Sequence, residues 1–93
     1  MQDYEALNRY LAAKEQAQKF AQERNRYLLN IRYAMERVLA PKDDFIATDF
    51  DAANVQENLN KAAEIHQNML IAVEEANSQA EACGKPKLEI FSK

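Results

Sequence analysis

"VLAPKDDFIATDFDAAN", residues 38–54, separates two long stretches of helix-forming sequence and so decides the fold. Pro41 disfavours helical backbone in the residue before it, which predicts that a helix ends just ahead of the proline. Several side chains that can cap a helix N-terminus follow, and the second helix is expected to begin at one of them. Phe50 and Val55 have hydrophobic-staple spacing if Asp51 is the cap. The alternative caps are Thr48 and Asp49.

A second stop follows in "EACGKPK", residues 81–87. Gly84 suits the left-handed position after a helix C-terminus, and Pro86 prevents continuation. With only one glycine and two prolines in 93 residues, the chain has few of the residues that favour the turns which further elements would need. The sequence therefore predicts an all-α fold in one domain, residues 1–93. Its parts are a long antiparallel hairpin of helices at about 3–39 and 51–83, and a short extended tail, 84–93.

Apolar residues recur along both predicted helices at alternating four- and three-residue spacing, as in a coiled-coil seam. Folding the chain back so that Val38 meets Ala52 gives a single register, in which Phe20 faces Met69. In that register Arg24 and His66, the two polar seam residues, face each other, which suggests a polar layer that fixes the register. The first seam is Ala6, Tyr10, Ala13, Ala17, Phe20, Arg24, Tyr27, Ile31, Ala34 and Val38; the second is Ala52, Val55, Leu59, Ala62, His66, Met69, Val73, Ala76, Ala80 and Cys83.

His66 is the only histidine and the first candidate for chemistry. A zinc or iron site needs three or four converging ligands, yet the helical neighbours of His66 are alanine, methionine and leucine. A nucleophilic mechanism needs Ser or Cys beside the histidine, but Cys83 lies about four to five turns away. The sequence thus predicts a structural histidine, no metal, no cofactor and no enzymatic activity.

Two helices alone leave half of their apolar surface in water, so further association is expected. A two-fold homodimer that forms a four-helix bundle is the simplest solution. The alternative is that the same surface packs on a different protein. The residues predicted for this surface are Tyr4, Leu7, Leu11, Leu29 and Tyr33 on the first helix, with Leu70 and Ile71 on the second.

Charge is distributed unevenly within a net charge of −3, because the first helix is basic and the second acidic. Glu57, Glu64 and Glu75 share the outer face of the second helix. They form either an ordinary solvated face or a surface that docks on a basic site, imitating nucleic-acid phosphates. On the first helix one flank gathers cations that could contact nucleic acid. These are Lys19, Arg26 and Arg37.

The expected setting is the cytoplasm, since the N-terminal residues have no apolar leader region, no run could span a membrane, and a single cysteine excludes an internal disulfide. The expected function is a non-catalytic protein–protein interaction module. Such a module could be a small adaptor, or an inhibitor of a larger, nucleic-acid-processing enzyme, of the kind that phages and mobile elements encode. The alternative is a dimeric helical hairpin that binds RNA or DNA through its basic first helix.

Overall fold

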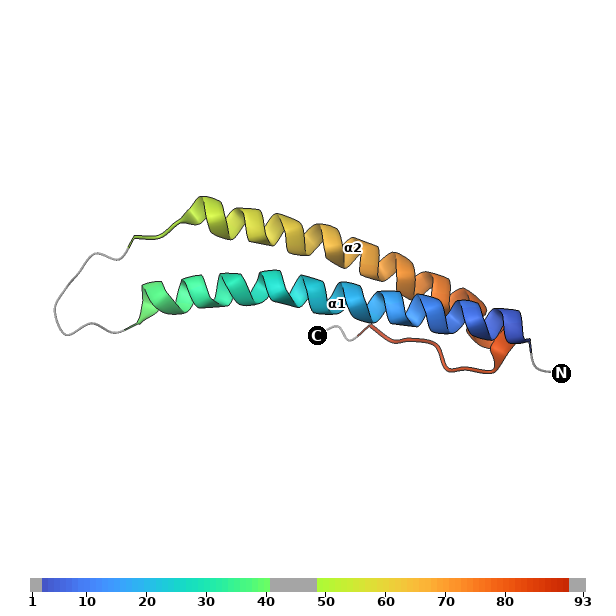
Figure 1. The fold of residues 1–93 in the computed structure, drawn as a ribbon. Helices are drawn as coiled ribbons and strands as arrows, with labels where there is room; N and C mark the ends of the chain where they lie inside the picture. The colour runs from blue at the N-terminus through green and yellow to red at the C-terminus, as the bar shows by residue number, and fades with distance from the viewer. Residues whose placement is uncertain (1–2, 41–48, 91–93) are drawn as a thin grey trace.

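The computed structural model describes residues 3–40 and 49–90. Helix α1 spans Tyr4–Leu39 and helix α2 spans Ala52–Cys83; the two run antiparallel, side by side (Figure 1). The predicted all-α hairpin is confirmed. Neither helix is long and apolar enough to cross a membrane. Residues 41–48 of the predicted loop, with the candidate cap Thr48, and residues 91–93 of the predicted tail lie outside the described residues.

Aspartates begin both helices one residue before the first helical turn. The Oδ1 atom of Asp3 accepts a hydrogen bond from the Ala6 N–H at 3.0 Å, and that of Asp51 accepts from the Asn54 N–H at 3.0 Å. Each carboxylate satisfies an N–H that has no partner within its helix and places negative charge at the positive end of the helix dipole. Of the alternative caps, Asp51 is the one used.

Gly84 ends α2 as predicted, with a φ of 70° in the left-handed region. Its N–H donates to the Glu81 carbonyl at 3.3 Å, and the next N–H, of Lys85, donates to the Ala80 carbonyl at 3.0 Å. These two bonds form a Schellman motif, which satisfies carbonyls that the helix leaves free. The chain therefore turns sharply away from α2 at this point.

The hairpin is tightly closed in the half that contains its two chain ends, which we call the closed half (residues 4–20 and 69–83). Its facing layers combine Tyr10 with Ala80, and alanine with alanine at Ala13 and Ala76, which is completely buried. Small side chains allow close approach of the two helices. Phe20 packs on the cluster that contains Met69, so the predicted register is confirmed.

Toward the loop the helices diverge (Figure 1), and we call this the open half (residues 24–39 and 52–66). No α1 residue is buried there. The seam prediction was wrong for Ala52 and Leu59, which are exposed. Larger facing side chains such as Tyr27 and Ile31 hold the helices farther apart than alanine layers do, and two helices cannot enclose them.

The seam of α2 is also wider than predicted, because Ile65 and Ala72 are buried although neither belongs to the heptad series. A straight α-helix has 3.6 residues per turn, whereas a strict heptad assumes 3.5. The contact line therefore drifts round the helix, and residues just beside the predicted seam enter the core.

After Gly84 the chain runs back along the hairpin without regular structure (Figure 1). The hydroxyl of Tyr10 donates to the Pro86 carbonyl at 3.0 Å, and Leu88 packs against both core clusters. Leu7 and Leu70, both predicted for the self-association surface, are half-buried against the same clusters. The tail thus adds a third layer to the packing, which helical periodicity in the sequence does not predict.

Candidate protein-interaction surfaces

Arg24 and His66 lie in contact where the closed half meets the open half. Nη1 of Arg24 is 3.0 Å from Nδ1 of His66 and 3.6 Å from the sulfur of Met69, and Nε donates to the Asn25 side chain at 3.1 Å. A guanidinium has no acceptor, so the imidazole must accept at Nδ1 and carry its proton on Nε2. The pair is a neutral–cationic hydrogen bond across the seam, at the level that the sequence predicted.

Within residues 3–40 and 49–90, no three side chains of His, Cys, Asp or Glu come together to hold a metal ion. Cys83 is buried, and its thiol donates to the Ala80 carbonyl at 3.5 Å within α2. Its environment is that of a core residue.

The hairpin has two flanks, one on each side of the seam. The flank that carries the tail, called the tail flank, follows α2 residues at steps of four, three and seven: Leu59, Ala63, His66, Leu70 and Asn77. The opposite flank, called the acidic flank, follows Glu57, Glu64, Asn68, Ile71 and Glu75. Each flank is apolar in one half of the molecule only.

On the tail flank the apolar surface lies in the open half, beyond the reach of residues 84–90. One hollow of about 320 Å³ is lined by Leu28, Leu59, Ala62, Ala63, Arg24 and His66. Another, of about 210 Å³, is lined by Met35, Val38, Leu39 and Phe50.

The edges of this surface carry little net charge. Arg32 pairs with Glu36 at 2.9 Å along α1, and Gln56 donates to Asn60 at 2.9 Å along α2. The result is an apolar strip between edges that are neutral overall. This strip was not predicted from the sequence, although Leu28 stands four residues from Arg24, on the same side of the helix.

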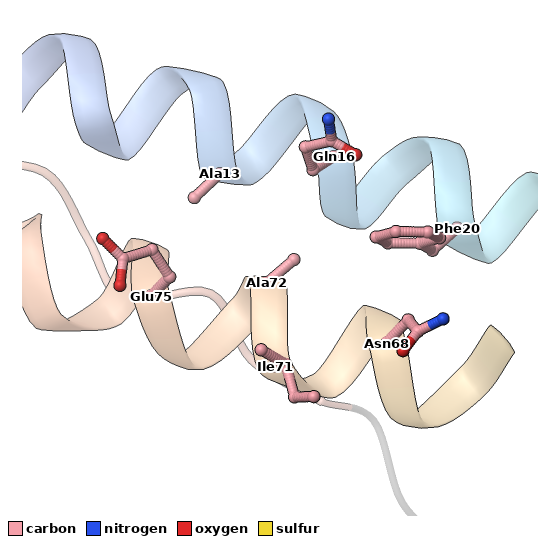
Figure 2. Close-up of a pocket in the computed structure, with 7 residues that line it drawn as sticks. All are labelled: Ala13, Gln16, Phe20, Asn68, Ile71, Ala72 and Glu75. Carbon is pink, nitrogen blue, oxygen red and sulfur yellow. The ribbon is translucent and has the colours of Figure 1, made fainter. Parts of the chain in front are cut away.

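The acidic flank has its apolar surface in the closed half, where a groove of about 450 Å³ lies between α1 and α2. Figure 2 shows Ala13 and Ala72 pointing into the space between the helices, with Phe20 on the α1 side. Ile71 lies on the α2 side, 65% exposed. The polar residues that complete the lining are Gln16, Asn68 and Glu75.

The groove brings together two residues that the sequence assigned to different sets, Ile71 to the apolar surface and Glu75 to the acidic face. Glu57, Glu64 and Glu75 are all exposed, at positions that continue this edge of α2. Phe20 had been assigned only to the seam. Its partial exposure follows from its position four residues after Gln16 and three before Glu23, on the same side of α1, a signal visible only once the flanks are known.

The outer face of α1 retains part of the predicted self-association surface. Tyr4, Leu11, Leu29 and Tyr33 are exposed there, spaced along the whole helix. Ile71 lies on α2 beside the groove, so the predicted set does not form one continuous patch.

The cations of α1 are distributed among several partners. Arg9 pairs with Glu5 at 2.7 Å, as its i,i+4 spacing favours. Of the three candidate nucleic-acid contacts, Lys19 is exposed, the Arg26 guanidinium lies 5.7 Å from the centroid of the Tyr27 ring, and Arg37 lines a hollow with two carboxylates. Those carboxylates belong to Asp49 and Asp51.

Comparison with models of protein families, with curated proteins and with solved structures found no match for this chain.

Proposed function

We propose that this chain is a protein-interaction module that catalyses no reaction and acts as a homodimer, in the manner of a small adaptor or an inhibitor of a larger enzyme. The observation that carries the proposal is the apolar strip of the open half, which none of the described residues covers. Large side chains of both helices, and Phe50 just before the cap of α2, are exposed there; those of the helices include Leu28, Met35, Leu39 and Leu59. Contiguous exposed apolar surface of this kind usually marks an interface.

A second copy of the chain fits this strip because the edges are neutral overall. Two-fold association places the same surface of each subunit against the other, so a surface with net charge meets an equal charge of the same sign. Here the edges carry the ion pair Arg32–Glu36 and the amide pair Gln56–Asn60, neither of which adds net charge. The cation that lines the strip, Arg24, donates a hydrogen bond across the seam to His66.

The tail supports this choice of surface from the other half of the same flank. Leu88 covers the core on the tail flank of the closed half. The exposed apolar strip therefore begins close to Arg24 and His66 and ends near Leu39 and Phe50. Two hairpins joined through this strip form a four-helix arrangement in their open halves. The closed halves are then left free to bind other molecules.

Sedimentation equilibrium over a range of concentrations tests the proposal. The expected result is a molar mass of twice the 10.7 kDa chain, with dissociation only on dilution. Hydrogen exchange should slow at Leu28 and Leu59 as the concentration rises. A monomeric mass at every concentration, with unchanged exchange, contradicts the homodimer.

A further inference from the structure

We propose that the groove on the acidic flank binds an amphipathic, positively charged helix of a partner protein. The inference rests on the proposed protein-binding function, but it concerns a different surface from the homodimer strip. The partner helix has an apolar stripe that packs on the floor and walls of the groove. Lysine or arginine residues beside this stripe face the acidic rim.

The shape of the groove favours a helix. It runs between two antiparallel helices, and its floor contains Ala13 and Ala72, whose small side chains let a third backbone come close (Figure 2). Phe20 and Ile71 stand on opposite sides, so apolar side chains at i, i+3 and i+4 of a guest helix can insert between them.

The rim of the groove favours a cation. Glu75 lines the groove itself, and Glu64 lies on the same edge of α2, where Asn68 separates the two at helical spacing. Glu23 continues the α1 edge one turn beyond Phe20. Carboxylates beside an apolar groove attract a cationic partner over a Debye length and select against an anionic one.

The nearby cations do not cancel this charge. Arg9 lies on the α1 edge but is paired with Glu5 at 2.7 Å. Lys19 is exposed on the same side of α1, four residues before Glu23, so these two residues together add no net charge. Lys61 lies on the α2 edge between Glu57 and Glu64, so one cation is set between two carboxylates, and Glu75 stands beyond them. The rim therefore keeps a net negative charge.

The same charge argues against a second copy in this groove. Two-fold docking through the acidic flank would bring Glu64 and Glu75 of the two copies into one interface, where like charges repel. The tail flank has no such conflict. The open half, on its tail flank, thus suits a second copy of the chain, and the closed half, on its acidic flank, suits a cationic partner.

The test uses the full-length chain and synthetic helical peptides of about 15 residues, or four turns. The probe peptide carries leucines on one face and lysines on the other. One control peptide replaces every lysine with glutamate, and a second keeps the leucine–lysine composition but scatters the leucines round the helix. Titration calorimetry at low and at moderate salt measures each affinity, with circular dichroism to check that the variants stay helical.

We expect the leucine–lysine peptide to bind and both control peptides to bind at least about tenfold more weakly. Ile71→Gln should weaken binding at least about tenfold, because it removes an exposed apolar wall without touching the core. The matched variant Leu11→Gln, on the outer face of α1, should leave it unchanged. Glu64→Lys with Glu75→Lys should transfer the preference to the leucine–glutamate peptide.

Equal binding of the lysine and glutamate peptides, or an affinity that Ile71→Gln does not change, overturns the inference. Conversion of a homodimer to a monomer by Ile71→Gln also overturns it, because the occupant is then a second copy. The two proposals fail separately. A dimer that binds no peptide contradicts the groove assignment alone, and a monomer that binds the lysine peptide through Ile71 contradicts the homodimer alone.

Discussion

The side-chain amide of Asn77 pairs with the backbone of Leu88: Oδ1 accepts from the Leu88 N–H at 2.7 Å, and Nδ2 donates to the Leu88 carbonyl at 3.1 Å. One side chain thereby satisfies both backbone groups of a residue that belongs to no helix or sheet. This pair, with the Tyr10 hydroxyl on the Pro86 carbonyl, holds the tail on one flank of the hairpin. The tail therefore covers the tail flank of the closed half, and the groove on the acidic flank stays exposed.

Asn77→Ala should release the tail. The variant loses two part-buried hydrogen bonds, each with a net contribution of about 1 kcal/mol, so the free energy of unfolding should fall by about 1–2 kcal/mol. Urea denaturation measures the loss, and hydrogen exchange at the Leu88 amide reports the release. Asn68→Ala, an exposed asparagine of α2 on the opposite flank, is the matched control: it gains the same helix propensity, up to about 0.7 kcal/mol, and should leave exchange at Leu88 unchanged. An unchanged exchange rate at Leu88 in Asn77→Ala contradicts this role.

His66 should be a neutral imidazole with its proton on Nε2, because Arg24 donates to Nδ1. Nitrogen-15 NMR distinguishes the two ring nitrogens by their chemical shifts and by their couplings to the ring protons. Arg24→Met removes the donor, and the ring should then become a mixture of tautomers. A protonated Nδ1 in the unaltered protein would show that the hydrogen bond is absent.

The Arg24–His66 pair should specify the register more than it stabilises the fold. Replacing both by leucine, Arg24→Leu with His66→Leu, restores an apolar seam and should keep the chain helical by circular dichroism. We expect the variant to populate more than one oligomeric state in sedimentation velocity. A single species identical to the unaltered protein contradicts a role in register.

Gly84→Ala should lower the free energy of unfolding by about 1 kcal/mol, because alanine disfavours the left-handed backbone conformation of this residue. The backbone φ is 70°, and a Cβ added at this position meets nothing within 4 Å. The loss therefore comes from left-handed backbone alone, which asparagine tolerates better than alanine. Gly84→Asn should lose less, as measured by urea denaturation. Equal stability of all three proteins would mean that the Schellman turn does not constrain the chain.

The helices and their ends could be predicted because their signals are local. Asp51 lies next to the helix that it caps, Gly84 lies next to the helix that it ends, and the seam repeats within each helix. The facing of Phe20 and Met69 followed from the same repeats once the loop fixed the fold-back point. Patterns among residues that are close in the sequence therefore predicted most of the architecture.

The surfaces were harder to predict because they depend on contacts between distant parts of the chain. Leu7 and Leu70 were assigned to a free surface, but the tail covers their side of the hairpin through Asn77 and Leu88. The divergence of the open half depends on the combined size of facing side chains, which no single helix reveals. The groove required both flanks to be known, although Ile71 had been assigned to an exposed apolar surface and Glu75 to the outer face of the same helix.

The most direct test of the homodimer compares Leu28→Lys with Leu29→Lys by sedimentation equilibrium. The two leucines are neighbours in the open half of α1 and are 40% and 42% exposed, but Leu28 lines the apolar strip whereas Leu29 points to the outer face. An ammonium group buried in an interface beside Arg24, which lines the same hollow, is strongly unfavourable. Leu28→Lys should therefore give a monomer that remains helical, and Leu29→Lys should remain a dimer like the unaltered chain. A dimeric Leu28→Lys, or a monomeric Leu29→Lys, contradicts the assignment of the strip.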